Sequence, residues 1–151
     1  MNQWAEQRNW ESVEAGDQLT TMRFPLTLHR LIVEAGANKD FAAIHINSDW
    51  AKSKGASEMF ANNVFLQAMW ERVVREYIGL AGTIRRIGPF RMSRFTTVGE
   101  VVEVSGTVAR KWADGDSHLV EISMSSRTSV GETMRGSVLV TLPTAADAKH
   151  N

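Results

Sequence analysis

The sequence contains no cysteine, no excess of charge of either sign and no long apolar run. Without thiols there are no disulfides and no thiolate metal sites, which fits a reducing compartment. Lys and Arg together number 17, as do Asp and Glu, so no basic field indicates nucleic acid or an anionic membrane as a partner. No stretch approaches the roughly 20 apolar residues that span a bilayer, and the N-terminal segment lacks a signal-peptide pattern. We therefore expect a cytoplasmic protein.

The chain is long enough for one domain with its own core. Its 151 residues are 43% hydrophobic and 23% charged, a profile that is typical of globular proteins. We take residues 1–151 as a single domain. We expect its ends to fray over about 1–7 and 145–151, where no periodicity is present.

Helical signals dominate the first half of the chain. After a short strand that ends at Pro25, the pattern predicts a helix over 26–36, with Gly36 as its stop. A second, short helix is expected after Asn47 or Ser48, either of which is a suitable N-cap.

The strongest helical pattern runs from Asn62 to Ile78. Its polar residues form one i, i+4 row, Gln67, Glu71 and Arg75, and nearly all of the rest is apolar. Such a wide apolar arc predicts a helix that is buried on most sides.

The second half alternates with period two, as half-buried antiparallel strands do. The inward residues are expected to be Val102, Val104, Gly106, Val108, Val120, Ile122, Met124, Met134, Gly136, Val138 and Val140. A hairpin turn is expected at Asp114–Gly115, and a further strand over 86–95. Together these elements predict an α+β domain, a curved antiparallel sheet wrapped around one long helix. The open edges of such a sheet favour dimerisation.

An acid and an imidazole lie five positions apart in "KDFAAIHIN", at Asp40 and His45. Taken alone, they fit an exposed loop acid and a half-buried structural histidine as well as a catalytic pair. The surrounding segment "AGANKDFAAIH", residues 35–45, resembles the hydratase signature of the MaoC-like, R-specific enoyl-CoA hydratases, commonly A-G-A-S-G-D-F-N-P-I-H. "FRMSRFTTVGEVVEVSGTV" resembles that family's R-F-x-x-P-V-x-x-G-D-x-L segment, and the similarity extends over about 10–142.

The resemblance implies the hotdog fold and a hydro-lyase acting on 2-enoyl or 3-hydroxyacyl thioesters of coenzyme A or an acyl carrier. It implies that Asp40 and His45 activate water, and that the N–H near Asn63 receives the thioester oxygen. Asn62 and Asn38 are further candidates for oxyanion or substrate binding. Coenzyme A would enter only as part of the substrate, with no other cofactor. The assembly implied is a homodimer or higher homo-oligomer, or a hetero-oligomer with another hotdog chain.

The sequence departs from the family pattern at three places. Asn47 stands where the family has an aspartate shortly after the histidine, at a capping position where either residue works. Ala42-Ala43 stands where the family has Asn-Pro, and Asn62-Asn63 stands where it usually has His-Gly. Helix capping and lining of the site are both open for the two asparagines. The departures leave room for a non-catalytic hotdog partner subunit, and a hotdog thioesterase is a further alternative.

Four arginines, Arg85, Arg86, Arg91 and Arg94, are candidates for binding the phosphates of coenzyme A. A solvated strand face explains them equally well. The remaining histidines are scattered and have no close acidic or histidine neighbours, so no metal site is expected.

Overall fold

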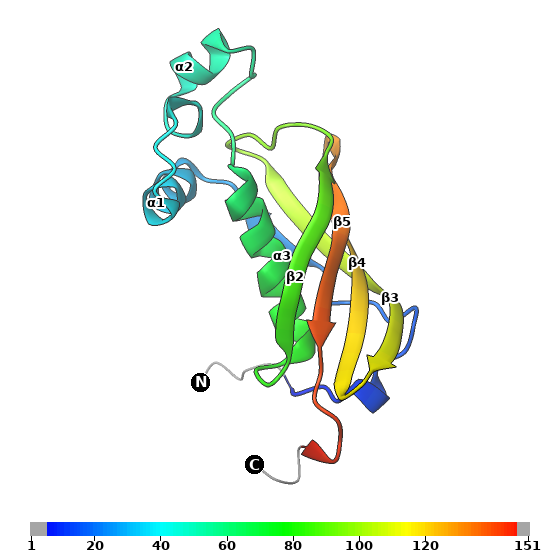
Figure 1. Cartoon of the computed structure of the whole chain (residues 1–151). Helices are drawn as coiled ribbons and strands as arrows, with labels where there is room; N and C mark the ends of the chain where they lie inside the picture. Colours follow the sequence, from blue (N-terminus) through cyan, green and yellow to red (C-terminus); the bar gives the residue numbers. More distant parts are fainter. Residues whose placement is uncertain (1–5, 148–151) are drawn as a thin grey trace.

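The computed structural model describes residues 6–147, in which a curved antiparallel sheet wraps around one long helix (Figure 1). The five strands lie in the order β1-β3-β4-β5-β2, and every neighbouring pair is antiparallel. The strands are β1 (Met22–Pro25), β2 (Thr83–Met92), β3 (Val101–Asp114), β4 (Ser117–Thr128) and β5 (Gly131–Thr141). The helices are α1 (Leu28–Asn38), α2 (Ser48–Ser53) and α3 (Asn63–Ile78), with the 3₁₀ turns η1 (Trp10–Ser12) and η2 (Ala43–His45). The predicted α+β class and the helix-in-sheet architecture are confirmed.

Helix α3 is the core element, as its apolar arc predicts. Its buried residues are Leu66, Met69, Trp70, Val73, Val74, Tyr77 and Ile78. Trp70 is fully buried, and its indole N–H donates to Ser126 Oγ at 2.7 Å, so the core holds this large ring without an unpaired donor.

The period-two pattern correctly predicted the inner face of the sheet. All of the predicted valine, isoleucine and methionine positions on β3, β4 and β5 are at most 2% exposed. The hairpin turn lies one residue later than expected, at Gly115 and Asp116, because Asp114 still pairs with Ser117. Gly115 has φ +56°, a conformation that favours glycine in such turns.

Strand β2 covers 83–92 rather than the predicted 86–95. It pairs with β5 as far as Met92, opposite Met134. Beyond that point the chain leaves the ladder and docks on the segment before α3, where Ala61 N–H donates to Thr96 O at 2.9 Å and Val98 N–H to Met59 O at 3.0 Å.

Gly36 was the wrong stop for α1. The helix continues to Asn38 and ends at Lys39, which has φ 58° and lies in the left-handed region. The N–H groups of Lys39 and Asp40 both fold back onto the last turn, and Asp40 N–H donates to Ala35 O at 2.9 Å. Hydrogen bonding of the turn thus overrides the preference for glycine at this position.

Residues 28–61, which we call the arm, lie around the N-terminal end of α3 and outside the sheet, with α2 extending beyond the helix end (Figure 1). The arm contains α1, η2 and α2, and its last residues return the chain to the start of α3. As predicted, α2 is capped by Asn47, whose side chain accepts from Trp50 N–H at 2.9 Å.

No helix within residues 6–147 is long and apolar enough to cross a membrane.

Near the N-terminus the Gln7 side chain bridges Ile78 O and Ala81 N–H, both at 2.8 Å. Residues 1–5 and 148–151, the outer parts of the ends expected to fray, lie outside the described residues.

We predict that Ser126→Ala lowers the free energy of unfolding by about 1–3 kcal/mol, because the Trp70 indole N–H loses its acceptor in a dry core. Ser123→Ala on the exposed face of the same strand is the matched control, with an expected change within about 0.5 kcal/mol. Urea unfolding followed by tryptophan fluorescence measures both. Equal stability of the two variants would contradict the account of the core.

Candidate active site

The structure brings Asp40 and His45 together in the arm. Asp40 follows the left-handed turn at the end of α1, and His45 ends η2, where it is 8% exposed. His45 Nε2 lies 3.5 Å from Asp40 Oδ2, slightly beyond a good direct hydrogen bond. The two groups are therefore placed to share one water molecule.

The other ring nitrogen of His45 fixes the orientation of the ring. His45 Nδ1 lies 2.8 Å from the backbone oxygen of Phe60. A carbonyl oxygen can only accept, so Nδ1 carries a proton, and Nε2 is the ring nitrogen that faces Asp40. The Phe60 ring also meets the imidazole edge-on, with the ring centres 5.1 Å apart.

The loop after β2 packs against Phe60. The Phe95 ring stacks on the Phe60 ring with centres 4.1 Å apart, in addition to the backbone hydrogen bonds of the 93–98 segment. Arg94 anchors this loop through an ion pair with Glu100 and a hydrogen bond to Thr128 Oγ1 at 2.6 Å.

Asn62 caps α3, as one of the two readings of the sequence predicts, and it also contacts the candidate acid. It is 4% exposed and caps α3, with its Oδ1 accepting from Phe65 N–H at 2.8 Å. Its Nδ2 donates to Asp40 Oδ2 at 2.9 Å. A single buried amide therefore joins the start of α3 to the candidate acid.

Asn63 is the first residue of α3, and its side chain is exposed. Among residues 6–147, the backbone N–H groups of Asn63 and Val64 have no hydrogen-bond partner. First-turn N–H groups of this kind, together with the helix dipole, favour a negatively charged oxygen. The two N–H groups belong to the residues that directly follow Asn62, close to the Asp40–His45 pair.

Sequence reasoning missed Glu34, which lies on the last turns of α1. Its carboxylate accepts from the Asn38 amide, so Asn38 is engaged within the chain. Burial raises the pKa of Glu34 and the charge of Asp40 raises it further, whereas His45 and a hydrogen bond from Asn62 lower it. No motif marks Glu34, because its place beside Asp40 depends on the backbone reversal at Lys39.

The four arginines do not form one free cluster. Arg94 is only 27% exposed and is held in the Glu100 ion pair. Arg86 Nε donates to Gly88 O at 3.0 Å, while Arg85 and Arg91 are exposed on the edge strand β2. Within residues 6–147 no group of three or more His, Cys, Asp or Glu side chains is arranged to hold a metal ion.

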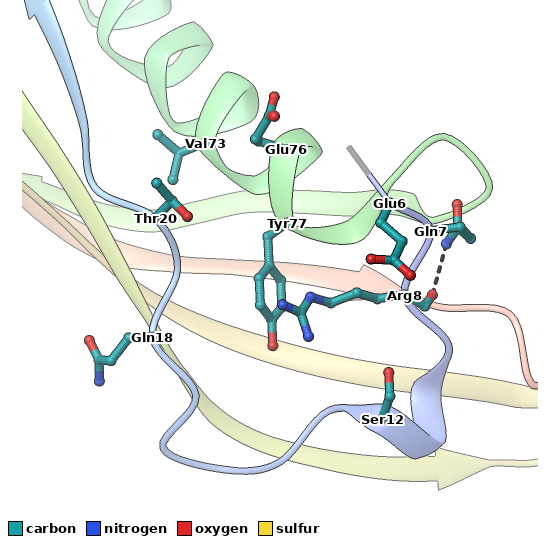
Figure 2. Close-up of a pocket in the computed structure, with 9 residues that line it drawn as sticks. All are labelled: Glu6, Gln7, Arg8, Ser12, Gln18, Thr20, Val73, Glu76 and Tyr77. Carbon is teal, nitrogen blue, oxygen red and sulfur yellow. Dashed lines mark hydrogen bonds between the residues drawn. The ribbon is translucent and has the colours of Figure 1, made fainter. Parts of the chain in front are cut away.

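A cavity of about 330 Å³ lies at the opposite end of α3 (Figure 2). Its lining residues are Glu6, Gln7, Arg8, Ser12, Gln18, Thr20, Val73, Glu76 and Tyr77. Arg8 lies over the Tyr77 ring at 4.5 Å, and burial together with a hydrogen bond to Asp17 raises the pKa of Tyr77 to about 12. Helix geometry separates Tyr77 from Asn62 by roughly 22 Å, so this cavity is separate from the Asp40–His45 pair.

Comparison with solved structures identifies the fold. The ChsH1–ChsH2 complex of Mycobacterium tuberculosis matches with a TM-score of 0.79 at 22% identity, over 85% of this chain and 98% of that chain. The R-hydratase PhaJ1 of Pseudomonas aeruginosa matches with a TM-score of 0.78 at 16% identity, over 90% and 86%. A MaoC-like dehydratase from Rhodospirillum rubrum matches with a TM-score of 0.70 at 19% identity, over 88% and 95%.

No family model matches this sequence, and no curated protein matches it at a significant level. At these identities the structural similarity shows the fold alone. The chain has the hotdog fold that the sequence resemblance implied, and it shares that fold with MaoC-like dehydratases and R-hydratases.

We predict that Asn62→Ala lowers the free energy of unfolding by about 1–3 kcal/mol, because it removes the cap of α3 and the buried donor to Asp40. Asn63→Ala, which changes the adjacent exposed asparagine, is the control, with an expected effect within about 0.5 kcal/mol. Urea unfolding compares the two. A loss of the same size in both variants would show that Asn62 does not link the two elements.

Proposed function

We propose that this protein is a hydro-lyase that hydrates 2-enoyl thioesters or dehydrates the 3-hydroxyacyl thioesters. The observation that carries the proposal is that Asp40 Oδ2 lies 3.5 Å from His45 Nε2, while the hydrogen bond of Nδ1 to Phe60 O fixes the orientation of the ring. The resemblance of residues 35–45 to the hydratase signature supports it. So does the fold shared with an R-hydratase and a MaoC-like dehydratase.

The chemistry needs a base and an acid on one face of the double bond. A water hydrogen-bonded to both Asp40 and His45 from one side adds its oxygen to the β-carbon of the thioester and gives one proton to the pair. The α-carbon then takes a proton from the same pair. One O–H bond of water and the π bond of the double bond break, while one C–O and one C–H bond form. The pair returns to its starting protonation after a proton passes between its members.

During this addition negative charge develops on the thioester oxygen. The unpartnered N–H groups of Asn63 and Val64 at the start of α3 are the donors we assign to it. Because Asn62 ties Asp40 to the same helix end, the acid and the oxyanion donors keep a fixed relative position. Coenzyme A or an acyl carrier enters as part of the substrate.

A second protein chain is part of the proposal. The arm carries exposed apolar side chains that a partner would cover: Leu28, Ile32, Val33, Phe41, Ile46 and Trp50. We propose a homodimer or a higher assembly as the working form. The ChsH1–ChsH2 neighbour is a complex of two different chains, which supports a mixed assembly as the alternative.

The test is a spectrophotometric hydration assay on short, long and branched enoyl-CoAs. We predict that Asp40→Asn and His45→Ala each lower kcat/KM at least about 100-fold, because each removes one partner of the proton transfer. Asp49→Asn and His29→Ala change an exposed acid and an exposed histidine of the same arm, and serve as controls with unchanged turnover. Undiminished turnover in the Asp40 and His45 variants would overturn the assignment.

Two outcomes of the same experiment separate the alternatives. If the chain is inactive alone but gains activity with a co-purifying hotdog chain, it is the partner subunit. If it releases free coenzyme A, detected with a thiol reagent, without hydrating enoyl-CoA, it is a thioesterase.

A further inference from the structure

The loop after β2 and the segment before α3 form a short antiparallel ladder. Two backbone hydrogen bonds, one on each side, place Phe60 opposite Thr97. In such a pair the two residues exchange no hydrogen bond with each other, and their own N–H and C=O groups point away from the partner strand. The Phe60 carbonyl therefore faces away from the loop, and its oxygen is free to lie 2.8 Å from His45 Nδ1.

Phe95 lies on the same face of this ladder as Phe60. It precedes Thr97 by two residues, and side chains of an extended chain alternate between faces, so Phe95 is the diagonal neighbour of Phe60. The two rings stack, with centres 4.1 Å apart and planes 17° from parallel. The Phe60 ring also meets the His45 imidazole, with centres 5.1 Å apart and planes at 84°. The three rings thus form a series from the loop to the imidazole, with Phe60 in the middle.

The backbone of Phe95 is held by groups on the sheet side of the molecule. Arg94 Nη1 donates to Phe95 O at 2.6 Å. The same guanidinium pairs with Glu100 and donates to Thr128 Oγ1 on β4. Glu100 in turn accepts from Thr97 N–H at 2.7 Å. The loop that presents the Phe95 ring to the arm is therefore fixed to the scaffold.

Phe60 contacts His45 twice, through its carbonyl oxygen and through its ring. Both groups belong to one residue, so a displacement of Phe60 changes both contacts. Phe60 is 7% exposed, whereas Phe95, which covers one face of its ring, is 51% exposed. A half-exposed ring contributes less to the core than a buried one, so replacing Phe95 should leave the fold intact.

We infer that Phe95 is a positioning residue of the proposed active site: its ring holds Phe60 in place and, through Phe60, the orientation of the His45 imidazole. This inference rests on the proposed function. Phe95 acts through Phe60 and not on the reacting atoms. Without the stacked ring, Phe60 gains freedom, and the His45 Nε2 atom that faces Asp40 loses its fixed position. A shift of about 1 Å in such a group can cost on the order of 100-fold in rate, so even partial loosening should be measurable.

Phe95→Leu is the central test, since it keeps an apolar side chain but removes the stack. We expect kcat for enoyl-CoA hydration to fall about tenfold while KM changes less than about threefold, because Phe95 orients His45 and does not bind the substrate. Phe95→Tyr keeps the ring and should retain kcat within about threefold of the parent. Leu80→Ala, which truncates another exposed apolar side chain beyond the C-terminal end of α3, is the control and should leave kcat and KM unchanged.

A second readout does not depend on activity. The His45 Nδ1–H that is hydrogen-bonded to Phe60 O should give a slowly exchanging proton signal in NMR of the ¹⁵N-histidine-labelled protein, and the His45→Ala variant assigns that signal. We expect its exchange with solvent to be at least about tenfold faster in Phe95→Leu and close to the parent rate in Phe95→Tyr.

The two readouts separate this inference from the proposed function. If the parent hydrates no enoyl-CoA but the exchange of the His45 proton depends on Phe95 as expected, the proposed function fails and the positioning role stands. If the parent is active, and Phe95→Leu leaves both kcat and the His45 exchange rate unchanged, the inference is overturned. A rise in KM at unchanged kcat would also overturn it, because Phe95 would then bind the substrate directly.

Discussion

The site depends on the placement of one buried amide. Asn62 Oδ1 caps α3, while Asn62 Nδ2 donates to Asp40, so the hydrogen bonds that begin the core helix also fix the candidate acid. An amide that is 4% exposed must use both of its ends, since an unpaired polar group in such a place costs about 1–3 kcal/mol. Stability and the geometry of the site are therefore coupled at this residue.

The scaffold and the chemistry lie in different parts of the chain. The sheet and α3 supply most of the core, to which the arm adds Leu31, Ala51, Met59 and Ala61, whereas Glu34, Asp40 and His45 all lie in the arm. The two parts meet at Asn62, which caps α3 and donates to Asp40, and at the 93–100 loop, which docks on the segment before α3. This arrangement allows a rigid helix end to present backbone donors to a site whose side chains come from elsewhere.

Periodicity was sufficient to predict the fold, because α3 and the strands β3 to β5 bury their apolar faces with regular spacing. The proximity of Asp40 and His45 also followed from the sequence, through the motif. The left-handed turn at Lys39 did not, because a lysine gives no local signal for positive φ. The place of Glu34 depends on that turn, and the ion pair of Arg94 with Glu100 depends on a loop docking that leaves no pattern in the sequence.

The central claim is that Asp40, His45 and the start of α3 converge on one substrate. A crystal structure with a saturated acyl-CoA, which cannot be hydrated, tests this most directly. We predict one ordered water bonded to both Asp40 and His45, facing the α- and β-carbons, and the thioester oxygen on the N–H of Asn63. An acyl group bound elsewhere, or an Asp40 that contacts only protein groups in the complex, would contradict the account.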